Sequence, residues 1–281
     1  MKERVVTFGP ERNLVGVLTQ PDQAGRNLPA LVFLNAGLLH RVGPYRMHVD
    51  LARRLAARGY PSLRFDLAGR GDSARASTGT DDPDAPLADI RHALDMLEEG
   101  GHGTHFVLFG LCTGADHAHR GAVLDPRVTG TIMLDGYGYR TWKFFVRRYA
   151  PALLSPARLL RSISSRLGNI LSHAREPAGD GPRPDQDEEF LWRLPAKADF
   201  AGDLRALVQR ETRMLYIYTA GVSSDYYNYQ DQFRDAFPDI DFRGCLQVQM
   251  FPDADHEFTL LEDRARMFDT ITGWLDRNFM S

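Results

Sequence analysis

The chain has 281 residues, 43% of them hydrophobic, and a formal net charge of −3. This length suits one large domain, or one domain plus a lid, while the small net charge gives no overall attraction to nucleic acid or to a membrane. With two cysteines, no apolar N-terminal core of signal-peptide length and no uncharged stretch of membrane-spanning length, the sequence predicts a cytoplasmic protein without a disulfide framework.

Predicted strands and helices alternate along most of the chain. Residues 3–8 and 14–19 alternate between apolar and polar side chains and predict two antiparallel strands. Later apolar runs predict strands within 30–37, 61–73, 105–110, 128–136, 213–221 and 245–256, and amphipathic patterns predict helices over 45–60, 86–101, 113–122 and 260–279. Strands and helices that alternate through short connections form a mostly parallel twisted sheet with helices on both faces.

One long segment interrupts this alternation. Residues 137–209 contain no clear core strand; they open with an aromatic and basic run and continue through a stretch rich in proline and acidic residues. We expect this segment to be a helical lid over the carboxyl edge of the sheet, and residues 1–136 and 210–281 to form the α/β core.

A cysteine lies where the third buried strand meets a helix. The sequence Gly110-Leu-Cys112-Thr-Gly114 has the G-x-C-x-G spacing of a nucleophile elbow, in which the residues two before and two after the nucleophile must be small. The N-terminus of the following helix favours a thiolate at Cys112, and the Thr113 amide is a candidate oxyanion donor. Packing as a small buried side chain is the alternative reading of this cysteine.

A histidine and an aspartate follow the last two strands in the order that an elbow enzyme uses. His256 comes after the final strand and is the candidate base, and Asp225 comes after the preceding strand and is the candidate acid that orients it. Asp135, at the end of its own strand, is the rival for the acid position.

The loop after the first parallel strand reads "NAGLLHRVGPYR" over residues 35–46. A loop in this place normally supplies the second oxyanion amide, and we assign that amide to Leu38. Gly37, His40 and Arg41 are candidate substrate contacts, although His40 and Arg41 could equally hold the loop in shape.

Aromatic and basic side chains gather at the start of the predicted lid. Tyr137, Tyr139 and Trp142 are expected to wall a bulky acyl pocket, or else to seat the lid on the sheet. The basic residues are Arg140, Lys143, Arg147, Arg148, Arg158, Arg161 and Arg166. They are candidates for docking an anionic carrier, such as an acyl-carrier protein or coenzyme A, and a solvated helix face is the equal alternative.

These motifs resemble the α/β-hydrolase superfamily over nearly the whole chain, through "FDLAGRGDS" (65–73), the Cys112 elbow, the late aspartate and His256. Residues 31–136 more closely resemble hydrolases associated with the exosortase A system. The superfamily implies an α/β-hydrolase fold, a catalytic triad and acyl chemistry, and the closer family implies a cysteine nucleophile. The sequence departs from that family at "CTGADHAH" after the nucleophile and in the lid, so the resemblance implies no particular substrate.

The sulfur atom of Cys112 restricts the expected class of substrates. A thiolate leaves a tetrahedral intermediate more easily than an alkoxide or an amine, so attack by Cys112 is productive mainly on activated acyl groups such as thioesters. The sequence therefore predicts an acyl hydrolase or acyltransferase in a biosynthetic pathway, and implies no metal or organic cofactor. A dienelactone-type hydrolase, and a cyclase or C–C bond-forming catalyst on the same fold, are the alternatives.

Overall fold

The computed structural model describes residues 1–23, 27–77, 83–153, 194–222 and 225–280. Its strands are β1 (Lys2–Phe8), β2 (Leu14–Gln20), β3 (Ala30–Phe33), β4 (Ser62–Phe65), β5 (Phe106–Leu111), β6 (Val128–Leu134), β7 (Arg213–Thr219) and β8 (Leu246–Phe251). Its helices are α1 (Met47–Ala56), α2 (Ala85–Glu99), α3 (Thr113–Leu124), α4 (Trp142–Leu153), α6 (Lys197–Gln209), α7 (Gln232–Ala236) and α8 (Leu261–Phe279), with short 3-10 turns η1 (Pro44–Arg46) and η3 (Ala220–Val222).

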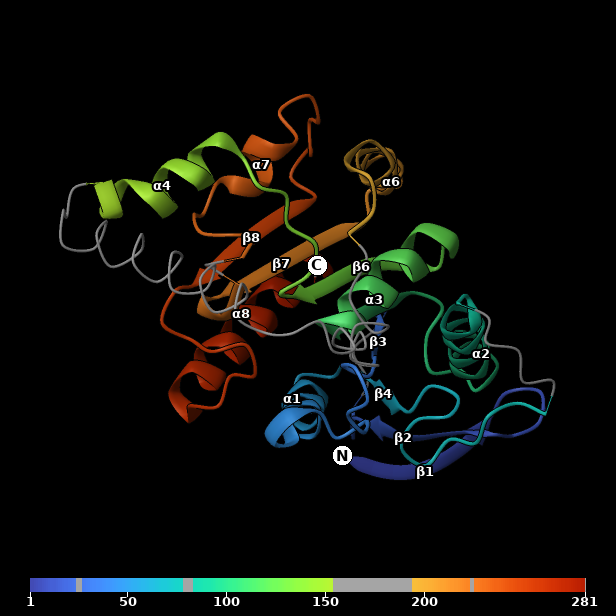
Figure 1. Ribbon diagram of the computed structural model, residues 1–281. Helices are drawn as coiled ribbons and strands as arrows, with labels where there is room; N and C mark the ends of the chain where they lie inside the picture. The colour runs from blue at the N-terminus through green and yellow to red at the C-terminus, as the bar shows by residue number, and fades with distance from the viewer. Residues whose placement is uncertain (24–26, 78–82, 154–193, 223–224, 281) are drawn as a thin grey trace, which may run out of the picture.

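The described strands form one eight-stranded sheet in the order β1-β2-β4-β3-β5-β6-β7-β8 (Figure 1). β1 pairs with β2, and β2 with β4, in antiparallel register, and the remaining neighbours are parallel. The α/β-hydrolase fold predicted from the sequence is therefore confirmed, including the antiparallel pair at the N-terminus. In the register, Leu111 of β5 lies opposite Leu134 of β6, which lies opposite Ile217 of β7. The residues that follow these three strands consequently meet at one edge.

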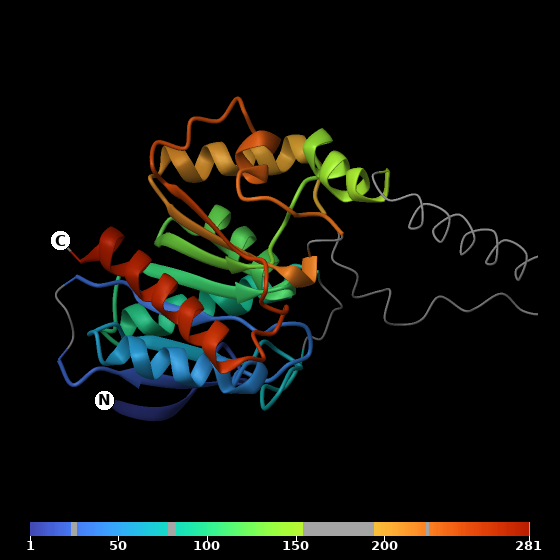
Figure 2. The same ribbon diagram turned by 90° about the vertical axis from the view of Figure 1, so that its left-hand side faces the viewer.

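Helices cover both faces of the sheet because each presents an apolar side to it. On one face, α1 and α8 lie side by side, as Figure 2 shows, and bury residues such as Leu51 and Ile271. On the other face, α2, α3 and α6 bury residues such as Leu94, Ala118 and Phe200. Strands β3 and β5, between these layers, are buried along their whole length, which explains their continuous apolar sequences.

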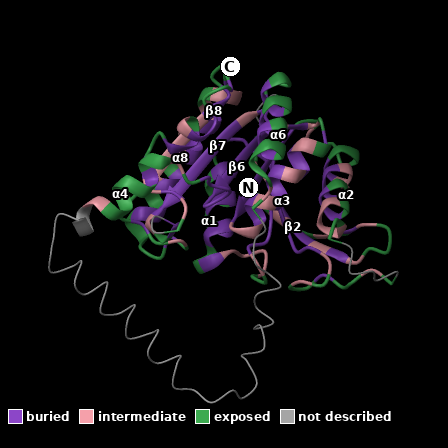
Figure 3. Cartoon of the chain, turned by 45° about the horizontal axis from the view of Figure 1, so that its top comes forward, coloured by how far each residue is buried: buried purple, intermediate pink, exposed green. Residues whose placement is uncertain are grey.

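The predicted lid begins and ends within the described residues. Helix α4 follows the predicted boundary at 137 and presents mostly exposed side chains (Figure 3). Helix α6, which the prediction also assigned to the lid, packs into the same apolar cluster as α3 through Phe200, Leu204 and Leu207. Residues 154–193, where most of the lid was predicted, lie outside the described residues, so the lid stays a prediction.

No helix in the described ranges has the length and apolar character needed to span a membrane.

Candidate active site

Cys112 occupies a sharp turn between β5 and α3. Its backbone has φ 56° and ψ −121°, a conformation that is costly for a residue with a side chain. A Cβ on Gly110 would lie 2.0 Å from the Gly114 carbonyl oxygen, and a Cβ on Gly114 would lie 2.7 Å from the Asn35 carbonyl oxygen. The turn therefore has room only for glycine at both positions, as the elbow spacing predicts.

His256 lies beyond β8 and contacts both a carboxylate and the Cys112 thiol. Its Nδ1 is 2.6 Å from Oδ2 of Asp135, and the thiol is the second hydrogen-bond partner of the ring. With Nδ1 facing the carboxylate, Nε2 is the nitrogen left for the sulfur. The hydrogen bond to Asp135 and then that to Cys112 raise the pKa of His256 to about 10, although burial opposes this change.

The carboxylate beside His256 belongs to Asp135, which corrects the assignment of Asp225 to this place. The side chain of Asp135 is fully buried. Its Oδ1 accepts a hydrogen bond from the Thr219 amide at 2.7 Å, and its Oδ2 accepts one from the Thr219 hydroxyl at 2.6 Å. These bonds from the end of β7 fix the carboxylate that faces His256.

Asp225 lies farther along the chain after β7, where it is exposed. Turn η3 carries the chain past His256, with Gly221 so close that an added Cβ would be 2.9 Å from the histidine Cβ. The backbone carbonyl of Asp225 accepts a hydrogen bond from Arg140 Nε at 2.6 Å. The sequence feature that pointed to Asp135 as an acid candidate is its position directly after a predicted strand, which is β6 in the structure.

The loop after β3 is tied to the elbow at Gly37. The Gly37 amide donates to the Thr113 hydroxyl at 2.7 Å, and Arg70 Nη1 donates to the Gly37 carbonyl at 2.7 Å. Gly37 has φ +54°, which suits glycine. The next amide belongs to Leu38, whose side chain is 71% exposed. The Thr113 amide is in the first turn of α3, where amides have no acceptor within the helix. The oxyanion assignment of Thr113 and Leu38 remains a prediction.

His40 and Arg41 bind acidic residues of the loop that follows β4. Asp66, with a fully buried side chain, accepts hydrogen bonds from the Arg41 amide at 2.6 Å and from Asn35 Nδ2 at 3.0 Å, and it forms an ion pair with the Arg41 guanidinium. Arg41 Nη2 also lies 2.7 Å from Asp72. These contacts favour the reading in which Arg41 holds the loop in shape over the reading in which it contacts substrate.

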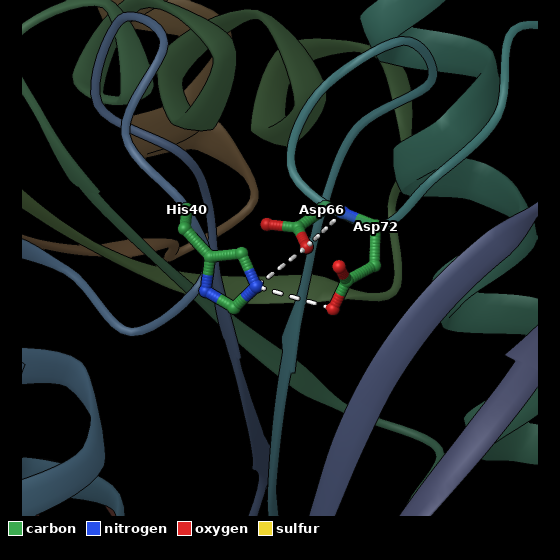
Figure 4. A group of neighbouring side chains, drawn as sticks. All are labelled: His40, Asp66 and Asp72. Atoms are coloured by element: carbon green, nitrogen blue, oxygen red, sulfur yellow. Dashed lines mark hydrogen bonds and ion pairs between the residues drawn. The ribbon is translucent and has the colours of Figure 1, made fainter.

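His40, Asp66 and Asp72 also have the side-chain types and the spacing of a metal site, because one ligand atom of each lies within 4.8 Å of the others. Figure 4 shows His40 Nε2 directed at both carboxylates, at 3.5 Å from Asp66 and 3.3 Å from Asp72. The Arg41 guanidinium already pairs with both carboxylates. The cluster is therefore explained as an ion-pair network that joins two loops.

Tyr137 and Tyr139 are buried and pack against Phe200 of α6. The Tyr137 hydroxyl binds Asp116, and the Tyr139 hydroxyl donates to the Pro195 carbonyl at 2.9 Å. These contacts favour the reading in which the two tyrosines seat the segment after β6 on the core. The third aromatic, Trp142, is 71% exposed at the start of α4.

Several of the basic residues predicted to dock a carrier have partners within the chain. Lys143 forms an ion pair with Asp235 at 2.8 Å, and the Arg147 guanidinium lies 5.2 Å from the centre of the Tyr229 ring. Arg158, Arg161 and Arg166 lie outside the described residues. The docking of an anionic carrier stays a prediction.

A cavity of about 410 Å³ adjoins the site and is lined by Gly138, Arg140, Leu194 and Tyr226. The Tyr226 hydroxyl donates to the Asp135 carbonyl at 3.0 Å. Burial chiefly raises the pKa of Tyr226, and electrostatic interactions with Asp135 and then with Cys112 raise it further. Tyr226 thus contacts both the cavity and Asp135, which in turn holds His256.

A second cavity, of about 470 Å³, lies between the start of β8 and the end of α8, at the opposite edge of the sheet from Cys112.

A strained elbow, with a histidine and a buried carboxylate at the neighbouring strand ends, defines a protein of the hydrolase class. The chain belongs to the alpha/beta hydrolase family, whose model matches residues 31–270. No curated protein matches the chain.

Solved structures with the same fold include several hydrolases. The alpha/beta hydrolase GrgF from Penicillium sp. sh18 is 15% identical, with 100% of both chains covered and a TM-score of 0.61. The Pyrococcus furiosus esterase Pf2001 is 15% identical over 100% of this chain and 91% of its own, with a TM-score of 0.61. A serine hydrolase without a lid from Xanthomonas campestris is 15% identical over 100% and 97%, with a TM-score of 0.56. At these identities the likeness shows the fold alone.

Proposed function

We propose that the protein is a cysteine-dependent acyl hydrolase or acyltransferase that acts on activated acyl groups, with thioesters as the leading substrate class. The observation that carries this proposal is the contact of His256 with both the Cys112 thiol and the buried carboxylate of Asp135. A base held between a nucleophile and an orienting acid is the arrangement used in covalent acyl transfer. The resemblance of residues 31–136 to exosortase A-associated hydrolases, with their Gly-Leu-Cys elbow, also supports a cysteine nucleophile.

In the first half of the reaction, the thiol proton of Cys112 already resides on His256, and the sulfur attacks the acyl carbon. The resulting oxyanion accepts hydrogen bonds from the Thr113 and Leu38 amides. The C–S bond to the leaving thiol then breaks, His256 returns the proton to that thiol, and the acyl group remains on Cys112 as a thioester. In the second half, water or another acceptor gives a proton to His256 and attacks the acyl carbon, and the departing Cys112 sulfur recovers that proton.

The raised pKa of His256, about 10, supports this sequence of proton transfers. Near neutral pH the imidazolium form is favoured beside the Asp135 carboxylate and the Cys112 sulfur, so a proton is available to the leaving group. A thiolate leaving group departs with little protonation by His256, whereas an alkoxide leaving group depends much more on being protonated. This comparison favours thioesters over ordinary esters as substrates.

Intact-protein mass spectrometry with acyl thioesters of increasing chain length tests the proposal. Each series pairs a coenzyme A thioester with its N-acetylcysteamine analogue, which separates acyl recognition from carrier recognition. We expect a mass increase equal to the acyl group in the wild type and none in Cys112→Ala. If no thioester gives an adduct while a small enol-lactone is hydrolysed, the protein is instead a dienelactone-type hydrolase.

A further inference from the structure

The cavity beside the candidate active site combines apolar walls with one cationic side chain. Among the described residues that line it, Gly138, Leu194 and the ring of Tyr226 offer apolar surface, and Arg140 is the one with a charge. Its volume of about 410 Å³ lies within the range of small-molecule sites. An apolar cavity with one fixed charge is suited to a hydrocarbon chain that carries one group of opposite charge.

Arg140 is held in a defined orientation. Its Nε donates to the Asp225 carbonyl at 2.6 Å, and its guanidinium carbon lies 5.9 Å from the centre of the Phe144 ring. Phe144 is itself buried, with 1% of its surface exposed. Because Nε is engaged, the two terminal nitrogens of the guanidinium are the ones left to bind a ligand.

The charge of Arg140 has no ion-pair partner among the residues that the structure describes. The neighbouring cation on α4, Lys143, differs in this respect because it pairs with Asp235 at 2.8 Å. The two terminal nitrogens of a guanidinium match the two oxygens of a carboxylate, so a carboxylate is the anion that this group binds with the best geometry.

The cavity is connected to the reacting groups through Tyr226. The same side chain lines the cavity and donates its hydroxyl to the Asp135 carbonyl at 3.0 Å. Gly138 reaches the cavity three residues after Asp135, and an added Cβ there would lie 2.5 Å from the Tyr226 ring. Tyr226 therefore borders both the cavity and the loop that carries Asp135, which places the cavity beside the proposed acyl site.

We propose that this cavity selects acyl groups that end in a carboxylate, and that Arg140 is the residue that determines this specificity. The proposal rests on the proposed function, since it names the acyl class that Cys112 would receive. The preferred substrates are half-thioesters of dicarboxylic acids, with the thioester at Cys112 and the free carboxylate at Arg140.

Matched pairs of N-acetylcysteamine thioesters test the inference, because their thiol portion is uncharged. Each pair has the same chain length and ends either in a carboxylate or in its methyl ester, over a series of lengths. We expect kcat/KM to favour the carboxylate by about 10- to 100-fold at the best length, mainly through KM. Arg140→Gln should lower kcat/KM for the carboxylate to that of its methyl ester, Arg140→Lys should keep part of the preference, and the exposed control Arg205→Gln should keep all of it.

Binding of the free dicarboxylic half-acid to Cys112→Ala, measured by calorimetry, gives a second readout without turnover. Weaker binding by the Cys112→Ala, Arg140→Gln double variant supports the inference, and equal binding overturns it.

Acyl adducts that form on Cys112 with no charge preference also overturn it while leaving the proposed function intact. A loss caused by Arg140→Gln that appears only with coenzyme A thioesters would assign Arg140 to the leaving group's phosphates and overturn the acyl assignment. The absence of any Cys112 adduct would instead reject the proposed function itself.

Discussion

Asp135 Oδ2 lies 2.6 Å from His256 Nδ1 and 2.6 Å from the Thr219 hydroxyl, so one buried oxygen joins the ends of β6, β7 and β8. The Thr219 amide donates to the other oxygen at 2.7 Å. The carboxylate is therefore fixed before any substrate binds, and it fixes the imidazole in turn. This relationship makes Asp135, at the end of β6, the acid of the proposed mechanism.

Asp135→Asn should lower kcat for acyl transfer by about 10³- to 10⁴-fold, since an amide cannot stabilise the imidazolium and holds the wrong tautomer. Asp225→Asn is the matched control, because its carboxylate is exposed after the neighbouring strand; we expect its kcat on uncharged substrates to stay within about threefold of wild type. Steady-state kinetics with one neutral thioester measures both. A larger loss in Asp225→Asn than in Asp135→Asn would reject this assignment.

The sequence placed the elbow and His256 well, because both depend on local patterns: a buried strand, small residues around a cysteine, and a histidine after the last strand. The acid was misassigned because the sequence offers an aspartate after each of two neighbouring strands. Only the tertiary structure shows that Gly221 packs against His256 while Thr219 holds Asp135. A local sequence pattern does not show whether the loop after β6 or the loop after β7 brings its aspartate to His256.

The same limit applies to α6 and to the ion-pair network of Arg41. The apolar side of α6 predicts a buried face but not the layer that it joins, so its packing beside α3 was assigned to a lid. For Arg41, the sequence shows a cation near a glycine-rich turn. Its choice of Asp66 and Asp72 over a substrate depends on how close the β3 and β4 loops come in the folded chain.

The ring of His256 should titrate with a pKa of about 10, well above the usual 6.5. Asp135→Asn should lower this pKa most, because the Asp135 hydrogen bond is its largest cause, and Cys112→Ala should lower it less. Nitrogen-15 NMR of histidine-labelled protein measures the titration, with His256→Gln to assign the signal. A wild-type midpoint near 6.5 would contradict the ion-pair arrangement.

A stability consequence follows from the same pKa, with a definite sign. Because the folded state binds the His256 proton more tightly than the unfolded state, this proton stabilises the fold fully below pH 6.5. The contribution is lost as the pH rises from 6.5 toward about 10. The difference in unfolding free energy between wild type and His256→Gln should therefore shrink across this window in urea titrations, and a difference that grows with pH would contradict the argument.

Thr113→Val should impair the proposed oxyanion site while preserving the shape of the side chain. The Thr113 hydroxyl accepts the Gly37 amide at 2.7 Å and so positions the following Leu38 amide. Loss of this bond should lower kcat by about 10-fold, in line with one hydrogen bond, with little change in KM. Thr113→Ser keeps the acceptor and should retain most of the activity. Equal kcat in the valine and serine variants would show that the hydroxyl does not position the loop.

Gly110→Ala should destabilise the fold by at least about 3 kcal/mol, because the new Cβ would clash with backbone atoms that cannot move aside. The nearest atom, the Gly114 carbonyl oxygen, would be 2.0 Å away. Gly202→Ala is the matched control: it is exposed on α6, with nothing within 4 Å of the added Cβ. There the same change should stabilise the protein by about 0.5–1 kcal/mol, because alanine favours a helix interior over glycine. Urea unfolding measures both variants, and similar stability of the two would mean that the elbow tolerates a side chain two residues before Cys112.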